Sequence, residues 1–399
     1  MLLGVGLFSC FQGGGDDGVP LPELTPFDEE LAERLEEIAD DAADIRGLDL
    51  YDDIEQGTLT REQLKKYSEE WADHLLEDDE FNFDAFNIAF RMLGMIGPED
   101  DLLEISTTFQ GSQVAGFYSY EDRSLVLVTD DAEDLSGYDE TVLAHEYVHS
   151  FQDGAFDLQE LMKLADEEEE DKANTEYSDT LSALIEGDAE YAQMEYTLKA
   201  IDEDDFDAFD IPASEPGDDE PIPPAFQRYF SFPYTYGSDF VSYLYDEGGW
   251  DEVDEAYEDP PSTEEQIMHP EKYLSDEDAV GISMPDFSDD LGDGWNQEAD
   301  DVFGEFDVYN WLLSVLDEDG VAELGAEGWG GGRLAVYGNE EEEERAVIHM
   351  ALFWDNTMEA RQFYTAFADV VRSIDGEPDI LDPSAQIVAW VGAGQGGQA

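Results

Sequence analysis

The net charge of this chain restricts its folding more than any other feature. Among its 399 residues there are 104 Asp and Glu but 16 Lys and Arg, which gives a formal net charge of −88 at pH 7. Such a surface repels itself and destabilises a compact state in dilute buffer. At about 1 M salt the Debye length falls to roughly 3 Å, which largely screens the repulsion. Because the acids are spread along the whole chain, the composition indicates a folded protein from a halophilic environment.

The remaining composition supports a folded chain and narrows the choice of partners. Hydrophobic residues make up 42% of the chain and aromatic residues 12%, which is enough for a large core. We expect no nucleic acid and no anionic membrane surface as partner, because 16 basic residues cannot form the necessary patch. The single cysteine, Cys10, excludes an internal disulfide framework.

Cys10 ends the apolar run MLLGVGLFSC and is followed by the flexible acidic stretch FQGGGDDG. This arrangement resembles the end of a lipoprotein signal peptide, in which the cysteine is lipidated and becomes the mature N-terminus. The apolar run is too short to span a membrane. We therefore expect residues 1–24 to be a signal remnant and tether that anchors the protein outside the cell through lipid on Cys10. The alternative is a short N-terminus without structure.

The first hundred residues have the pattern of a helical layer. A first helix is expected with Thr25 as its cap and Pro26 in its first position. A second helix is expected from Thr60 to about Leu76, and a third, FDAFNIAFRMLGMI, ends near Gly97. Residues 25–100 should therefore be mainly helical.

The pattern then changes to strands and two longer helices. Short strands are expected at Val114–Tyr118 and Ser124–Val128, joined by an acidic turn. Helices are expected at about 138–153 and 176–200, so residues 104–200 should combine edge strands with helices. The acidic, proline-rich stretch from Asp202 to Pro224 reads as a loop.

The last part of the chain consists of an aromatic-rich region followed by a region whose pattern predicts an α+β module. Residues 225–300 are rich in aromatic residues and loop signals. A helix near 301–316 precedes a strand–strand–helix–strand module, made of RLAVYG, RAVIHMALFW, residues 356–372 and QIVAW. The run Glu340–Glu344 is expected to be the hairpin loop between the first two of these strands.

The stretch TVLAHEYVHSFQD carries the clearest chemical motif. Positions i and i+4 lie on one face of a helix, so His145 and His149 can direct two imidazoles at one metal ion. Glu146 follows His145 and can reach a water molecule on that ion. Ser136 and Asp139 form a capping box at the expected helix start. The alternative is a pair of histidines on a solvated helix face.

A catalytic zinc site needs a third protein ligand and leaves the fourth position for water. The stretch TLSALIEGDAEYAQMEY has an apolar helical stripe with Glu186 at its edge. We expect Glu186 to complete a His, His, Glu site. Glu190, one turn further on, is expected to accept a hydrogen bond from the other ring nitrogen of a ligand histidine, which would fix its tautomer and orientation.

The stretches LAHEYVHSFQD and LIEGDA resemble the gluzincin metallopeptidases, in which a HExxH helix is followed by a helix that supplies a glutamate. The chain is also similar, over roughly residues 80–370, to a family of HExxH-containing surface or secreted proteins of archaea and bacteria. This similarity lies in the order of those two stretches and of four others: VAGFYSYEDRSLVLV, FPYTYGSDFV, STEEQIMHPEKY and GWGGGRLAVY. The resemblance implies that His145, His149 and Glu186 bind Zn²⁺ and that Glu146 is the general base.

The resemblance also implies that Ser124–Val128 is the sheet edge along which an extended peptide lies. PYTYG matches a Tyr-x-x-Gly element of gluzincin aminopeptidases through Tyr234 and Gly237, which implies that Tyr234 stabilises the oxyanion; the alternative is an aromatic turn in the core. No motif that holds a free amino terminus is present, so the resemblance does not extend to the substrate. Three histidines are expected to be ordinary structural or surface residues: His74, His269 and His349.

We therefore predict an α+β fold, with a zincin-like catalytic region at residues 25–300 and a C-terminal module at residues 301–399. The predicted function is a zinc-dependent hydrolase, a cell-surface peptidase acting on peptides or proteins. The alternative is a non-catalytic surface-binding or structural protein that keeps the zinc site. Glu146 favours the enzyme, because a structural zinc site needs no base beside its ligands.

The net charge of −88 predicts that folding depends on salt. Circular dichroism between about 0.1 and 4 M salt should show secondary structure and melting temperature rising with salt, because screening removes the self-repulsion. Equal spectra and equal melting temperatures at both ends of the series would contradict the halophilic interpretation.

Overall fold

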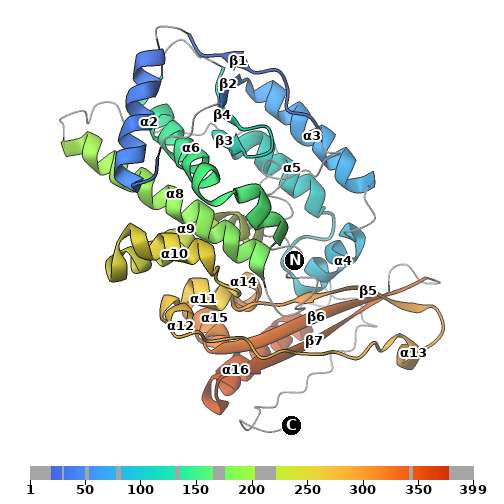
Figure 1. Ribbon diagram of the computed structural model, residues 1–399. Coiled ribbons are helices and arrows are strands. Elements are labelled where there is room, and N and C mark those ends of the chain that lie inside the picture. The colour runs from blue at the N-terminus through green and yellow to red at the C-terminus, as the bar shows by residue number, and fades with distance from the viewer. Residues whose placement is uncertain are drawn as a thin grey trace.

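A computed structural model describes residues 19–28, 31–49, 54–77, 82–130, 135–164, 176–202, 222–340 and 345–376. Over these residues the fold is mixed α+β, as predicted. Two sheets lie at opposite ends of the molecule, and helices fill the space between them (Figure 1). Three features predicted from the sequence lie wholly or mostly outside the described residues: Cys10 with its tether, the 202–224 loop and the QIVAW strand.

The first sheet consists of β1 (Thr25–Pro26), β2 (Glu55–Leu59), β3 (Gly116–Ser119) and β4 (Ser124–Val128). Its order is β1-β2-β4-β3, with β2 and β4 parallel and the two outer pairs antiparallel. β3 and β4 confirm the two predicted strands. The first predicted helix is present as α2 (Ala32–Arg46), but its predicted start at Thr25 is wrong, because Thr25 and Pro26 form β1 and pair with β2. Pro26 suits an edge strand, which needs no donor from its nitrogen.

The predicted sheet edge is also wrong. β4 lies between β2 and β3, so the edge strand is β3 rather than Ser124–Val128. β2 was not predicted, because its sequence, EQGTL, has no alternating apolar pattern. β2 also interrupts the helical layer predicted for residues 25–100.

Three helices lie between β2 and β3 in the chain: α3 (Arg61–Glu77), α4 (Phe83–Leu93), which contacts β5 and β6, and α5 (Leu102–Gln113). The predicted start of α3 is confirmed, because the Thr60 backbone N–H donates to Gln63 Oε1 at 2.8 Å and the Gln63 N–H donates to Thr60 Oγ1 at 3.3 Å. α4 ends at Gly94, whose φ of 75° lies in the left-handed region that glycine favours. α5 was not predicted.

The middle of the molecule is built from α6 (Gly137–Phe156), α8 (Tyr177–Asp202) and α9 (Pro224–Gly248). The prediction of a loop-rich region from residue 225 is wrong at its start, because α9 has 25 residues and continues through Pro233. Its aromatic side chains pack in the core, where the Phe232 and Phe306 ring centroids lie 4.5 Å apart. This burial outweighs the hydrogen bond that a proline removes from a helix. Four short helices follow: α10 (Trp250–Glu258), α11 (Glu264–Met268), α12 (Pro270–Leu274) and α13 (Ser288–Leu291).

The C-terminal module contains an antiparallel sheet of order β5-β6-β7. Its elements are β5 (Trp295–Val302), α14 (Glu305–Leu316), α15 (Asp319–Ala326), β6 (Trp329–Asn339), β7 (Ala346–Trp354) and α16 (Thr357–Gly376). β6, β7 and α16 confirm the predicted strand–strand–helix order. The helix predicted from residue 301 begins later, because residues 301 and 302 still pair with β6. Residues 341–344 of the predicted hairpin loop lie outside the described residues.

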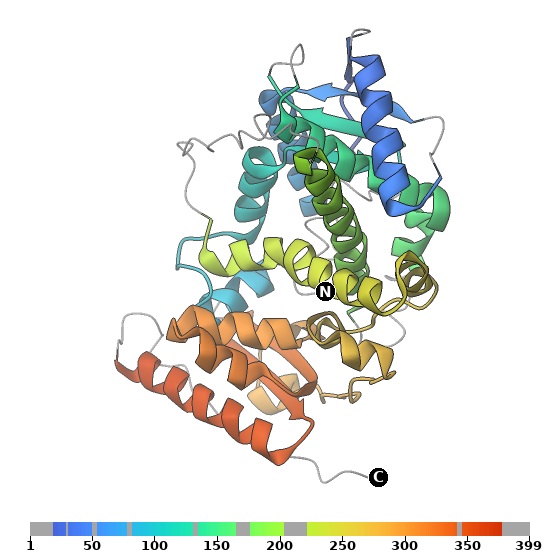
Figure 2. The same cartoon turned by 90° about the vertical axis from the view of Figure 1, so that its left-hand side faces the viewer.

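One continuous core of buried side chains extends from α2 to α16. α9 crosses the middle of the molecule, with α6 and α8 on one side and the C-terminal module on the other (Figures 1 and 2). A smaller core lies between α3 and the first sheet and includes Leu64, Trp71 and Val126. α9 therefore connects the two ends of the molecule.

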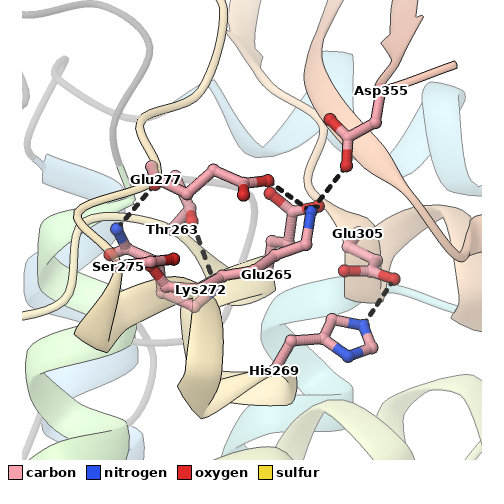
Figure 3. Close-up of polar contacts among 9 residues, drawn as sticks. Thr263, Glu265, His269, Lys272, Ser275, Glu277, Glu305 and Asp355 are labelled. Atoms are coloured by element: carbon pink, nitrogen blue, oxygen red, sulfur yellow. Dashed lines mark hydrogen bonds and ion pairs between the residues drawn. The ribbon is translucent and has the colours of Figure 1, made fainter.

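The α11–α12 turn joins the C-terminal module through charged side chains (Figure 3). The Lys272 ammonium lies 2.7 Å from Glu265, 2.5 Å from Glu277 and 2.7 Å from Asp355. Beside it, His269 Nε2 lies 3.0 Å from Oε1 of the buried Glu305. His269 is therefore paired with Glu305 and does not belong to the His145–His149 cluster.

Three carboxylates, Glu176, Glu264 and Asp307, are buried together where α8, α11 and α14 meet. Backbone N–H groups stabilise them: Glu264 N–H donates to Glu176 at 3.1 Å and Gly304 N–H donates to Asp307 at 3.0 Å. Burial raises the pKa of Glu176 and Glu264 well above the usual range, and it raises the pKa of Asp307 to about 6. The cluster therefore holds protons at pH values where exposed carboxyls have lost them.

This cluster predicts that the free energy of unfolding falls as the pH rises. Below the unfolded-state pKa of these groups the contribution is fully present, and it is lost as the pH rises through the higher folded-state values. Glu264→Gln should flatten this dependence above about pH 5, because the amide keeps the acceptor and needs no proton. Urea unfolding at molar salt measures it, with the exposed Glu271→Gln as control. An unchanged slope in Glu264→Gln would contradict the assignment.

Candidate metal centre

α6 carries the HEYVH stretch and is buried from Thr141 to Asp153. It packs against α2, α8 and both β3 and β4. The predicted capping box is present: the Ser136 N–H donates to Asp139 Oδ2 at 2.8 Å, and the Asp139 N–H donates to Ser136 Oγ at 3.2 Å. This cap fixes where α6 begins, and therefore which of its side chains face α8.

His145 and His149 direct their Nε2 atoms at each other and at Glu186 of α8. The two Nε2 atoms are 3.0 Å apart. Glu186 Oε2 lies 3.2 Å from Nε2 of His145 and 3.3 Å from Nε2 of His149. All three side chains are buried, so the three atoms form a nearly equilateral triangle inside the protein.

The size of this triangle suits a tetrahedral zinc ion. Bonds of about 2.0–2.1 Å place the ligand atoms of such an ion about 3.3 Å apart. The observed separations of 3.0, 3.2 and 3.3 Å lie at this value or slightly below it. Two imidazole nitrogens and one carboxylate oxygen are also donors that zinc accepts, and three ligands leave a fourth position for water or substrate.

The charges of the three side chains are strongly coupled. Burial acts to lower the pKa of His149, but the neighbouring Glu186 and Glu146 carboxylates outweigh burial and raise this pKa to about 9. Burial acts to raise the pKa of Glu186, but the two histidines hold it well below its usual range. The cluster thus retains a proton at neutral pH. A divalent cation would displace this proton, so metal binding should release it.

Glu146 is buried next to the same cluster and contacts the edge strand. The Tyr118 backbone N–H on β3 hydrogen-bonds to its carboxylate, and a Cβ added at Gly116 would lie 3.4 Å from its Cγ. Burial raises the pKa of Glu146, although the two histidines oppose the shift. Glu146 therefore combines a raised proton affinity with a position between both histidines and β3.

Tyr234 approaches the cluster from α9. Its ring centroid lies 6.2 Å from that of His145, and its hydroxyl hydrogen-bonds to Glu186. Burial and the Glu186 and Glu146 carboxylates raise the pKa of Tyr234 well above its usual range, so the hydroxyl keeps its proton. The suggestion of an aromatic turn at Tyr234 is wrong, since the residue lies within a helix.

Two glycines allow α9 to reach this position. A Cβ added at Gly237 would lie 2.1 Å from the carbonyl oxygen of Ala183, and one added at Gly187 would lie 2.1 Å from the backbone of Gly237. α8 and α9 therefore cross backbone to backbone. Gly187 follows Glu186, and Gly237 lies one turn after Tyr234, so this crossing places the carboxylate and the phenol side by side.

Glutamine side chains face the outer ring nitrogens of both histidines. His145 Nδ1 lies 3.1 Å from Gln193 Oε1, whereas Glu190 Oε2 is 3.9 Å away and beyond hydrogen-bonding distance. His149 Nδ1 lies 2.8 Å from Gln152 Oε1. Neither glutamine was predicted from the sequence. Gln152 could have been found, because it lies three residues after His149 on the same helix face.

Two other described groups of acids have the spacing of metal ligands, but each already has partners. Glu265, Glu277 and Asp355 surround the ammonium of Lys272 (Figure 3). The Glu176, Glu264 and Asp307 group accepts backbone N–H donors. Among the described residues, the group of His145, His149 and Glu186 is the one set of possible metal ligands that combines histidine with carboxylate.

Substitution of Gly237 tests the helix crossing. Gly237→Ala should lower the free energy of unfolding by about 1–3 kcal/mol, because α9 must move away from α8 to admit the methyl group. Denaturant unfolding at molar salt measures the change. Gly320→Ala in α15 is the control, since nothing lies within 4 Å of its added Cβ. Equal stability of the Gly237 variant and wild type would rule out the close crossing.

Comparison with known proteins adds one partial match. A family described as "Domain of unknown function (DUF8575)" matches residues 292–398, which include β5 to α16 but none of α6, α8 and α9. Neither a curated protein nor a solved structure matches the chain. Within the part of the chain that the structure describes, no helix has the length and apolar character needed to cross a membrane. The chain is thus similar to a family over its C-terminal module, while the candidate metal centre lies outside the matched part.

Proposed function

We propose that this protein is a zinc-dependent hydrolase with a zincin-like core, and that its substrates are peptides. The observation that carries the proposal is the triangle of His145 Nε2, His149 Nε2 and Glu186 Oε2, with sides of 3.0 to 3.3 Å, next to the buried Glu146. A structural zinc site would not need a buried carboxylate beside its ligands. Glu146 therefore favours catalysis over a purely structural or surface-binding role.

Each of these side chains has a proposed part in hydrolysis. His145, His149 and Glu186 would hold the zinc ion, which when bound would act as a Lewis acid and make a water molecule nucleophilic near neutral pH. Glu146 accepts the proton of the attacking water and passes it to the leaving amine. Tyr234 donates a hydrogen bond from its hydroxyl to the carbonyl oxygen of the substrate as negative charge develops there. Its raised pKa supports this part, because a phenol must be protonated to donate.

The edge strand β3 is the proposed platform for the peptide. The Val128 N–H donates to the Ala115 carbonyl at 2.8 Å, so hydrogen-bonded pairs with β4 recur at every second residue from Ala115. The polar backbone groups of Gly116 and Tyr118 therefore point away from β4. The Tyr118 N–H reaches Glu146, so this edge of the sheet faces the proposed general base. An extended peptide could add to this edge as a further strand.

The proposed location is the outer surface of a cell in a halophilic environment, with lipid on Cys10 as the anchor. The net charge of −88 and the apolar run that ends at Cys10 support this location.

The two glutamates should respond differently to substitution. Glu186→Ala should remove zinc and activity together, because it deletes a ligand. Glu146→Gln should keep nearly one zinc per chain while hydrolysis falls about 100-fold or more, the usual scale for loss of a general base. Metal analysis and casein hydrolysis at molar salt, with and without a chelator, provide both measurements.

Comparable zinc loss from both variants would refute this division of roles. Wild-type protein that binds one zinc per chain and hydrolyses nothing would instead support the structural or surface-binding alternative. Wild-type protein that binds no zinc would refute the metal centre itself.

A further inference from the structure

Gln152 makes three hydrogen bonds that fix the orientation of its amide. Its Nε2 donates to the Ile185 carbonyl at 3.1 Å and to Asp188 Oδ2 at 2.9 Å. Its Oε1 lies 2.8 Å from His149 Nδ1. The nitrogen and oxygen of an amide are assigned from such networks. Only the NH₂ end can face two acceptors at once, so the oxygen must face His149.

This orientation determines which nitrogen of His149 carries hydrogen. Gln152 Oε1 is an acceptor, so His149 Nδ1 must be the donor. In the neutral ring, the lone pair then resides on Nε2, which faces Glu186 and His145. A rotated Gln152 amide would direct N–H groups at Nδ1 and favour hydrogen on Nε2, which could not then bind a metal.

Asp188 holds Gln152 and is itself held by a buried arginine. Arg46 Nε lies 2.5 Å from Asp188 Oδ1, and both side chains are inaccessible to solvent. The Tyr257 hydroxyl donates to Asp188 Oδ2 at 2.8 Å, the same oxygen that accepts from Gln152. Arg46 also reaches Asp254 at 2.6 Å. A buried carboxylate that accepts from this many donors has little freedom to rotate.

We propose that Gln152 is a positioning residue for the metal centre: it holds His149 in the tautomer that binds metal, and the Asp188–Arg46 pair holds Gln152 in the orientation that this requires. The proposal rests on the proposed zinc site. Because Arg46 is the last residue of α2, the docking of α2 contributes to metal affinity through the Arg46, Asp188, Gln152 and His149 side chains.

The two ligand histidines differ in how well their partners can be replaced. Gln152 is fully buried, so no water molecule can replace its Oε1 as the acceptor for His149 Nδ1. Gln193 is partly exposed, and Glu190 lies 3.9 Å from the same His145 nitrogen. Loss of Gln152 should therefore weaken metal binding more than loss of Gln193. This difference makes Gln193→Leu the matched control.

The test measures zinc affinity by chelator competition on the full chain at molar salt. Gln152→Leu should raise the zinc dissociation constant about 10–100-fold, the usual effect of removing a partner of a ligand histidine. Gln193→Leu should raise it less. Tyr257→Phe keeps the ring and removes one donor to Asp188, so it should raise the zinc dissociation constant by a smaller factor. This variant replaces Gln152→Leu in the test if Gln152→Leu does not fold.

Nitrogen-15 NMR of the zinc-loaded protein provides a second readout. His149 should show an Nδ1–H proton protected from exchange in wild type, and this protection should be lost in Gln152→Leu. A purely structural role for Gln152 would leave the ring proton unchanged. Wild-type zinc affinity in Gln152→Leu, or in Tyr257→Phe if the former does not fold, would overturn the inference. Failure of the wild type to bind zinc would overturn the proposed function as well.

Discussion

Carboxylates buried inside this protein need a cation or a proton close by, because an isolated charge is too costly to remove from water. The chain has 16 Lys and Arg for 104 acids, so few cations are available for the interior. Arg46 compensates Asp188, Lys272 compensates Glu265, and protons compensate the Glu176 cluster. Glu186 is paired with two histidines and accepts a hydrogen bond from the Tyr234 hydroxyl, and a divalent cation could displace the proton that His149 carries.

The same helices that bury these charges position the site. α8 carries Glu186 and Asp188, and it contacts α9 where Gly187 and Gly237 allow the two backbones to meet. That contact brings Tyr234 beside Glu186, and α9 in turn packs on the C-terminal module through Phe232 and Phe306. The module and the candidate metal centre therefore share one core, although the family match covers the module alone.

Local features could be predicted from the sequence, whereas long-range pairing could not. The spacing of the two histidines and the Ser136 capping box each depend on a single helix. The structure brings His145 and His149 together and forms the capping box, as expected. Strand order depends on which segments pair, so β2 was missed and the edge was assigned to β4 instead of β3. The rotation of α8 against α6 places Gln193 nearer than Glu190 to His145, and no pattern in one segment reveals this rotation. α9 reads as a loop because it contains Pro233 and Gly237, but burial of its aromatic residues decides in favour of a helix.

The central claim is that two histidines and one carboxylate bind a single zinc ion in a tetrahedral site with one position left for water. X-ray absorption at the zinc edge, on zinc-loaded protein in molar salt, tests this most directly. The account predicts four nitrogen or oxygen neighbours at about 2.0–2.1 Å, with imidazole scattering from two rings that becomes one ring in His149→Ala. A six-coordinate shell without imidazole scattering, unchanged in His149→Ala, would contradict it.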